Sequence, residues 1–239
     1  MTLESESAPG RPTQDEGRDR TRNALLRAAA LEFSRFGYAD SALERVANEV
    51  WSSVEEGSTA GDLSAGAVYA RPELYHLFRS KEELALAVVQ WMEEAWYEEV
   101  GYLFADEADP VGALLAVARG HAVFCREFPA VGTTLRAEFE GRDHPVGRAI
   151  NLVLGRFVDD AVRLITIGRR SGAIPPGPPP RELALAYLGA LDWVVKTLRG
   201  QAPFDTLFAE RAALGLLGLA PAVDSGETQG STFAPPVVG

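Results

Sequence analysis

The sequence predicts an all-α protein with a small N-terminal three-helix domain and a larger helical C-terminal domain. Apolar residues recur with the 3.6-residue spacing of a helix through most of the 239 residues, and Gly, Pro or a capping box marks the ends of these stretches. A chain of this length can bury one large core or two modest ones. We interpret the pattern as two domains.

Composition favours a soluble globular chain. The hydrophobic content is 46%, and no apolar run reaches the roughly 18 residues that a membrane span needs. The N-terminus lacks the basic-then-apolar order of a secretory signal, and the single Cys125 cannot form an internal disulfide. We therefore expect a cytoplasmic protein with no membrane partner.

The N-terminal domain is expected at residues 18–84, after a polar tail at 1–17 that has too few large apolar residues to fold. Its first helix is expected from Arg18 to Phe36, with Gly37 as a natural stop. Ser41 and Glu44 have the spacing of a capping box, which predicts that Ser41 caps a second helix running to about Val50. The apolar stripe of the first helix consists of Leu25, Leu26, Ala29, Ala30, Phe33 and Phe36.

A third short helix is expected from Arg71 to just before Ser80. Pro72 suits the first turn of a helix, and Ser80 with Glu83 forms a second capping box that opens a longer helix. Residues 51–70 form an insertion before this third helix. They offer an alternative register at 64–70, and we prefer 71–78 because it keeps a fixed spacing to the second capping box.

The C-terminal domain is expected at residues 85–221, followed by a disordered tail at 222–239. The helix that begins after Ser80 continues to about Phe104 and connects the two domains. Pro and Gly residues separate the later helices. These are expected at Pro110 to Phe128, Val131 to Phe139, Pro145 to Arg170, Arg181 to Leu198 and Phe204 to Leu219.

Basic and aromatic residues gather where the third short helix meets the long one. Tyr75, His76, Arg79 and Lys81 lie at this corner, and four arginines lie within residues 18–27. Small helical domains contact the phosphates of DNA with such groups. The net charge of -11 does not exclude DNA, because the arginines form a local basic arm on an otherwise acidic chain.

The order of these elements resembles the N-terminal helix-turn-helix domain of TetR-type transcriptional regulators. The matching residues are Thr21-Arg22, Ala28-Ala29, Phe33, Gly37-Tyr38, Ser41, Leu43, Val46-Ala47, Leu74-Tyr75, Phe78 and Ser80-Lys81-Glu82-Glu83-Leu84. The resemblance implies a homodimer that binds a double-stranded, palindromic DNA operator. It places the DNA contacts at Arg20, Arg22, Ser41, Arg71, Tyr75, His76 and Lys81.

The second half resembles one TetR branch, the γ-butyrolactone autoregulator receptors. The resemblance lies in Arg136-Ala137-Glu138-Phe139-Glu140, in Arg181-Glu182-Leu183-Ala184 and in Thr197-Leu198-Arg199-Gly200-Gln201-Ala202. It implies a repressor released by a small apolar ligand such as a γ-butyrolactone-type signal. Aromatic residues and a few polar anchors are expected to line the ligand site, namely Trp91, His121, Phe124, Phe128, Thr134, Phe139, Phe157 and Trp193.

The last two helices carry more apolar residues than one packing face requires. The TetR resemblance implies that the surplus forms a four-helix interface with a second copy. The residues expected there are Leu188, Leu191, Val195, Phe204, Leu207 and Phe208.

Other chemistry lacks a supporting pattern. The three histidines fall in separate elements, Cys125 lies on an apolar helix face, and Asp159-Asp160 has no third carboxylate at helical spacing. We therefore expect no enzyme activity, metal or cofactor. Two alternatives stay open: a pseudo-receptor that responds to antibiotics or intermediates, and a helical ligand-binding protein or enzyme that has lost DNA binding.

Overall fold

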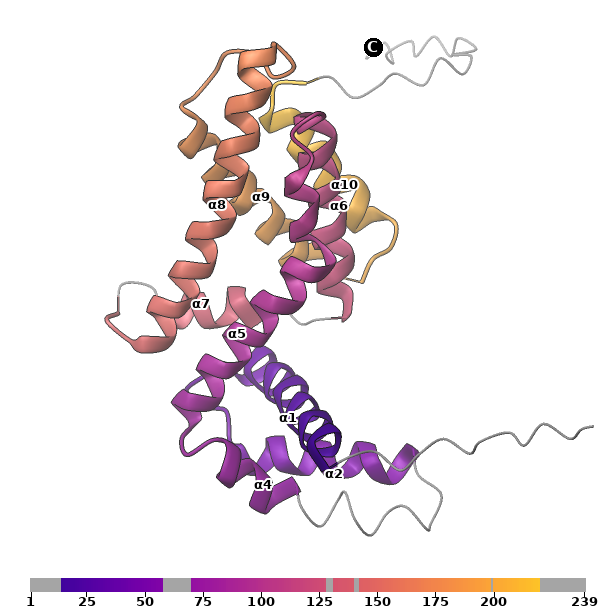
Figure 1. Ribbon diagram of the computed structural model, residues 1–239, viewed down its shortest axis with the longest axis vertical. Helices are drawn as coiled ribbons and strands as arrows, with labels where there is room; N and C mark the ends of the chain where they lie inside the picture. The colour runs from indigo at the N-terminus through magenta and orange to yellow at the C-terminus, as the bar shows by residue number, and fades with distance from the viewer. Residues whose placement is uncertain (1–13, 58–69, 128–130, 140–141, 199, 220–239) are drawn as a thin grey trace, which may run out of the picture.

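The computed structural model describes residues 14–57, 70–127, 131–139, 142–198 and 200–219. Within these ranges the regular structure is helical and contains no strand. The helices form two groups along the long axis of the molecule, and α5 passes from one group to the other (Figure 1). The expected all-α class and its division into a helix-turn-helix part and a C-terminal helical part are confirmed.

The lower group in Figure 1 contains α1 (Gln14–Phe36), α2 (Leu43–Gly57) and α4 (Ala70–Leu77). Helix α1 begins four positions before the expected Arg18. Helix α2 continues past Val50, so the first part of the expected insertion is helical, and residues 58–69 lie outside the described ranges. Helix α4 lies at the preferred register, and the alternative register also falls mostly outside them.

Ser80 caps its helix as expected, although the Glu83 side chain accepts the Arg79 amide and not that of Ser80, whereas Ser41 does not cap α2. Helix α5 (Lys81–Glu99) begins after Ser80, whose hydroxyl accepts a hydrogen bond from the Glu83 amide at 3.1 Å. Ser41 is buried and donates its hydroxyl to the carbonyl of Gly37. At the start of α2, the buried Glu32 carboxylate instead accepts the Ala42 amide at 3.0 Å. A side chain from α1 therefore accepts a backbone N–H at the start of α2, which is the kind of bond that we expected Ser41 to make.

The upper group begins with the C-terminal part of α5 and a 3₁₀ turn, η2 (Gly101–Ala105). Helices α6 (Pro110–Glu127), α8 (Pro145–Ser171), α9 (Pro180–Leu198) and α10 (Phe204–Leu216) complete it. The short α7 (Val131–Phe139) lies between the groups and packs against α1 and α8 (Figure 1). His144 caps the start of α8, where its ring accepts the Val146 amide at 3.2 Å. Gly172 follows the last residue of α8 and closes the helix with a φ of 77°.

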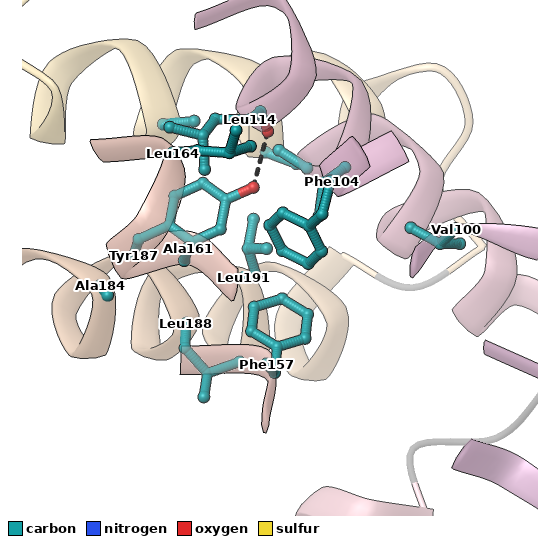
Figure 2. Packing of buried hydrophobic residues seen from close by; sticks show 14 of the residues in the cluster. Val100, Phe104, Leu114, Phe157, Ala161, Leu164, Ala184, Tyr187, Leu188 and Leu191 are labelled. Carbon is teal, nitrogen blue, oxygen red and sulfur yellow. Dashed lines mark hydrogen bonds between the residues drawn. The ribbon is translucent and has the colours of Figure 1, made fainter. Parts of the chain in front are cut away.

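Two hydrophobic cores correspond to the two groups. In the upper core, Tyr187 is fully buried and donates its hydroxyl to the Leu114 carbonyl at 2.6 Å, beside Phe104 and Phe157 (Figure 2). The lower core joins α1, α2, α4 and the start of α5. It also includes Leu135, Phe139, Val146 and Ile150 from α7 and α8. Residues that we expected in the ligand-binding part therefore help to build the core of the N-terminal part.

Candidate ligand cavity and its link to the N-terminal helices

A cavity of about 150 Å³ lies among α5, α6, α7, α8 and α9. Most of its wall is apolar, which is typical of pockets for small organic ligands. The residues that border it are Val89, Met92, Glu93, Trp96, Tyr97, His121, Phe124, Cys125, Arg136, Ile150, Val153, Leu154, Phe157, Leu188, Asp192 and Val195.

Trp96 occupies a central position in this wall. Its ring centroid lies 4.8 Å from that of Phe157 and 6.2 Å from that of His121. The indole N–H donates to Nδ1 of His121 at 3.0 Å. This bond fixes the tautomer, because an accepting Nδ1 carries no hydrogen and the proton of the neutral ring must then be on Nε2.

His121 is partly buried, and part of its surface borders the cavity. Burial lowers its pKa, against the opposing effect of the Asp192 carboxylate, so the ring is neutral near pH 7. Nε2 lies 3.8 Å from Sγ of Cys125, one helical turn along α6. A sulfur at this distance is a weak acceptor.

The charged groups of the wall are paired. Arg136 of α7 contacts Asp192 of α9 at 2.5 Å, and Glu93 forms an ion pair with Arg156 of α8. The Tyr97 hydroxyl donates to Asp160 at 3.1 Å, and burial together with that carboxylate raises the pKa of Tyr97. The tyrosine is therefore a neutral hydroxyl at physiological pH.

Helix α7 also contacts the turn between α1 and α2. The carboxylate of Glu138 accepts the backbone N–H groups of Tyr38 and, at 3.4 Å, Ala39. Gly37 has a positive φ of 72°, and a Cβ built there would lie 2.5 Å from a Glu138 oxygen. A glycine at this position therefore lets the carboxylate reach the turn.

Lys81, the first residue of α5, braces the same turn from the other side. Its ammonium donates to the carbonyls of Ala39 at 2.9 Å and Ser41 at 3.1 Å, and lies 4.8 Å from the centroid of the Tyr38 ring. The ring of Tyr38 also packs edge-on against Phe139 at 5.1 Å. The start of α5 and the end of α7 therefore hold the α1–α2 turn together.

Several solved structures share this arrangement of helices. A TetR transcriptional regulator from Chloroflexus aurantiacus J-10-FL is 21% identical, with a TM-score of 0.62, over 84% of this chain and 94% of its own. AibR, solved with isovaleryl coenzyme A and operator DNA, is 22% identical, with a TM-score of 0.57, over 83% of this chain and 96% of its own. FadR from Bacillus subtilis, solved with stearoyl-CoA, is 17% identical, with a TM-score of 0.61, over 82% of this chain and 97% of its own.

The fold is that of TetR-family transcriptional regulators. No protein-family model matches the sequence, and a comparison with curated proteins also finds no match. At these identities the likeness to TetR regulators concerns the fold. It gives no support for the γ-butyrolactone receptor branch that we expected.

Three of the expected ligand residues, His121, Phe124 and Phe157, border the cavity of this TetR-type fold. Trp91 is half-buried and packs against both cores, and Thr134 on α7 is not part of the cavity wall. Phe139 belongs to the lower core, Trp193 is 56% exposed on α9, and Phe128 lies outside the described residues.

Tyr97, Arg136 and Asp192 border the cavity but were not among the expected ligand residues. Tyr97 follows Trp91 on α5, and its aromatic character was the available signal. No pattern in the sequence could have paired Arg136 with Asp192, because they come from separate helices.

The expected DNA-binding residues have different surroundings. Arg20 and Arg22 are exposed on α1, and Tyr75 and His76 are exposed on α4, where the Tyr75 hydroxyl donates to Glu44 at 3.1 Å. The side chain of Arg71 lies outside the described part of the structure. Ser41 and Lys81 instead use their polar atoms on backbone carbonyls of the α1–α2 turn. Their proposed contacts with phosphate therefore compete with bonds inside the domain.

The expected dimer residues fall into two sets. Leu188, Leu191 and Val195 are buried within the protomer, so they cannot supply exposed area to an interface. Phe204, Leu207 and Phe208 on α10 are each about half exposed. Leu185 and Trp193 on α9 are also exposed, and Trp193 and Phe208 border one hollow between α9 and α10.

Within the described ranges, no group of three or more His, Cys, Asp or Glu side chains is placed to hold a metal ion. Among the same residues, none of the helices is both long and apolar enough to span a membrane.

Proposed function

We propose that this chain is a ligand-responsive, DNA-binding transcriptional repressor that acts as a cytoplasmic homodimer. A small apolar ligand, of which a γ-butyrolactone-type signal is one example, enters the cavity and releases the protein from a palindromic operator. One observation carries this proposal: α7 contacts the cavity through Arg136 and the α1–α2 turn through Glu138. The same short helix therefore joins a ligand-sized space to the helix-turn-helix part.

The DNA contacts are proposed for the exposed side chains of α1 and α4. Arg20 and Arg22 carry charges that suit phosphates, and Tyr75 and His76 present hydrogen-bonding groups beside them. A two-fold dimer presents two such surfaces to successive major grooves, which is why the operator is proposed to be palindromic. AibR, which has the same fold, was solved with operator DNA.

The second copy is proposed to cover the exposed apolar side chains of α9 and α10. Leu185, Trp193, Phe204, Leu207 and Phe208 gather on these two helices. Exposed large apolar side chains that gather in one place are a common mark of a protein interface. The buried Leu188, Leu191 and Val195 are not part of the revised interface.

Ligand binding is proposed to act through the two elements that brace the α1–α2 turn. A ligand that fits the cavity better in one arrangement of α5 and α7 favours that arrangement, and the turn moves with it. A coupling of about 1 to 3 kcal/mol would change operator affinity roughly 5- to 150-fold. This role requires no chemical step, so we propose no enzyme activity.

The test is binding to DNA from upstream of the protein's own gene, measured against salt and then against an alkyl-substituted γ-butyrolactone. The expected result is specific binding with a steep salt dependence. An affinity no better than that for random duplex, together with a flat salt response, would refute the repressor. Specific binding that the lactone leaves unchanged would refute that ligand type alone.

A further inference from the structure

The size and lining of the cavity restrict what can enter it. A volume of about 150 Å³ matches the engineered apolar cavity that admits benzene, so the enclosed part of a ligand is a single ring or a short chain. Aromatic and aliphatic side chains from α5, α6, α8 and α9 form most of the surface. The body of the ligand is therefore compact and apolar.

The charges in the wall disfavour an ionic ligand. A carboxylate or phosphate would need Arg136, which already contacts Asp192 at 2.5 Å. Displacing Asp192 would leave its carboxylate, only 17% exposed, without its cationic partner. An ammonium ion that replaced Arg156 at Glu93, which is 14% exposed, would exchange one cation for another and would still lose its own hydration on entering the apolar cavity. A neutral molecule avoids both costs.

One hydrogen-bond donor in the wall is poorly used. Trp96 occupies Nδ1 of His121, so the N–H is on Nε2, and the hydrogen-bonding partner that Nε2 has among the described residues is the Cys125 sulfur at 3.8 Å. A buried N–H without a good acceptor destabilises the protein. A ligand that accepts a hydrogen bond from it removes this penalty. His121 and Cys125 both border the cavity, so a ligand oxygen can reach this N–H.

We propose that the cavity selects uncharged ligands with a compact apolar body and one hydrogen-bond acceptor, such as a carbonyl oxygen, which accepts the Nε2–H of His121. This inference rests on the proposed function in taking the cavity as the ligand site. It deepens that function by naming the chemical class of ligand and the residue that selects it.

The experiment uses three probes of nearly equal shape and the same number of non-hydrogen atoms: acetophenone, isopropylbenzene and benzoate. Their dissociation constants are measured by tryptophan fluorescence with the full-length wild-type protein and with its His121→Leu and His121→Gln variants. Leucine removes the donor, whereas glutamine keeps an N–H donor of similar length. The quantity compared is the ratio of the isopropylbenzene constant to the acetophenone constant, because the ratio removes general effects of packing.

The expected result is a ratio that falls about 2- to 12-fold in His121→Leu, as for the loss of one hydrogen bond, and stays near the wild-type value in His121→Gln. Benzoate is expected to bind most weakly. A ratio that His121→Leu leaves unchanged, benzoate binding more tightly than acetophenone, or no binding by any probe to the full chain would overturn the inference.

A second measurement needs no substitution and stays decisive if a variant does not fold. Nitrogen NMR of labelled histidine in the full chain should show the Nε2-protonated tautomer of His121, with an N–H signal that acetophenone shifts and isopropylbenzene does not. The Nδ1-protonated tautomer, or equal shifts with both probes, would overturn the proposal. DNA binding is measured on the same samples. If it fails while carbonyl selectivity persists, the repressor is refuted and the ligand class stands.

Discussion

Replacing Glu138 by glutamine should loosen the α1–α2 turn while leaving the fold intact. The carboxylate accepts two backbone N–H groups, those of Tyr38 and Ala39. Glutamine has nearly the same shape, but only one oxygen can accept, and its amino group would face the second N–H. Hydrogen bonds to charged groups contribute about 1.5–3 kcal/mol each, and half-burial of Glu138 reduces this, so the local loss is about 1–2 kcal/mol.

This loss should appear as faster amide exchange. Since about 1.4 kcal/mol corresponds to a factor of ten, protection at the Tyr38 amide should fall roughly 5- to 30-fold, measured by hydrogen exchange with NMR detection. The proposed coupling also predicts that ligand changes operator affinity less in Glu138→Gln than in the wild-type protein. A smaller effect is expected at Ala39, whose bond to the carboxylate is longer.

Glu98→Gln is the matched control, because it makes the same chemical change on an exposed face of α5. It should leave protection at Tyr38 unchanged. If both variants melt at the wild-type temperature and Glu138→Gln keeps full protection at Tyr38, the carboxylate does not hold the turn, and the proposed path through α7 is refuted.

Three further predictions follow from the described contacts. Asp205→Asn should lower the free energy of unfolding in urea by about 2–3 kcal/mol, because it breaks a buried ion pair with Arg126, which is 29% exposed and can be partly solvated. The Arg126 guanidinium lowers the pKa of Asp205 below 3.8. The difference in unfolding free energy between wild type and Asp205→Asn should therefore be largest above pH 3.8 and should shrink as the pH falls through the folded-state pKa. Lys81→Met should lower the melting temperature and leave the salt slope of DNA binding nearly unchanged, whereas Arg22→Ala should reduce the slope by about one; equal slopes would contradict these roles. Leu207→Asp should yield monomers in sedimentation experiments, and a dimer as stable as the wild type would refute the α10 interface.

The control for the interface prediction is Leu152→Asp. Leu152 is 66% exposed on α8, outside the α9 and α10 patch. The same charge placed there should leave the association state unchanged.

Helix positions could be predicted from the sequence where local chemistry decides them. Ser80 with Glu83, and the glycines at 37 and 172, mark helix ends through bonds or backbone angles within a few residues. The Ser41 box did not form: the Ser41 hydroxyl donates to the Gly37 carbonyl, and Glu32 from α1 accepts the amide of Ala42, the residue before α2. Local patterns offer a cap, and tertiary contacts decide whether it is used.

The candidate site was only partly predictable. The TetR resemblance placed His121, Phe124 and Phe157 among the expected ligand residues, and all three border the cavity. On α9, however, the adjacent residues Asp192 and Trp193 have different surroundings, since successive helical positions differ by about 100° in direction. The sequence shows that this helix is largely apolar, but not which part of its surface its own protomer covers.

The sequence by itself determined the all-α class, the approximate ends of the helices and the division into an N-terminal and a C-terminal group of helices. These features depend on side-chain periodicity and backbone preferences over a few residues. Only the tertiary structure decided that Arg136 pairs with Asp192, that Trp96 holds the tautomer of His121, and that Glu138 and Lys81 brace one turn. Each of these depends on how separate helices pack, and helical periodicity contains no information about the partner.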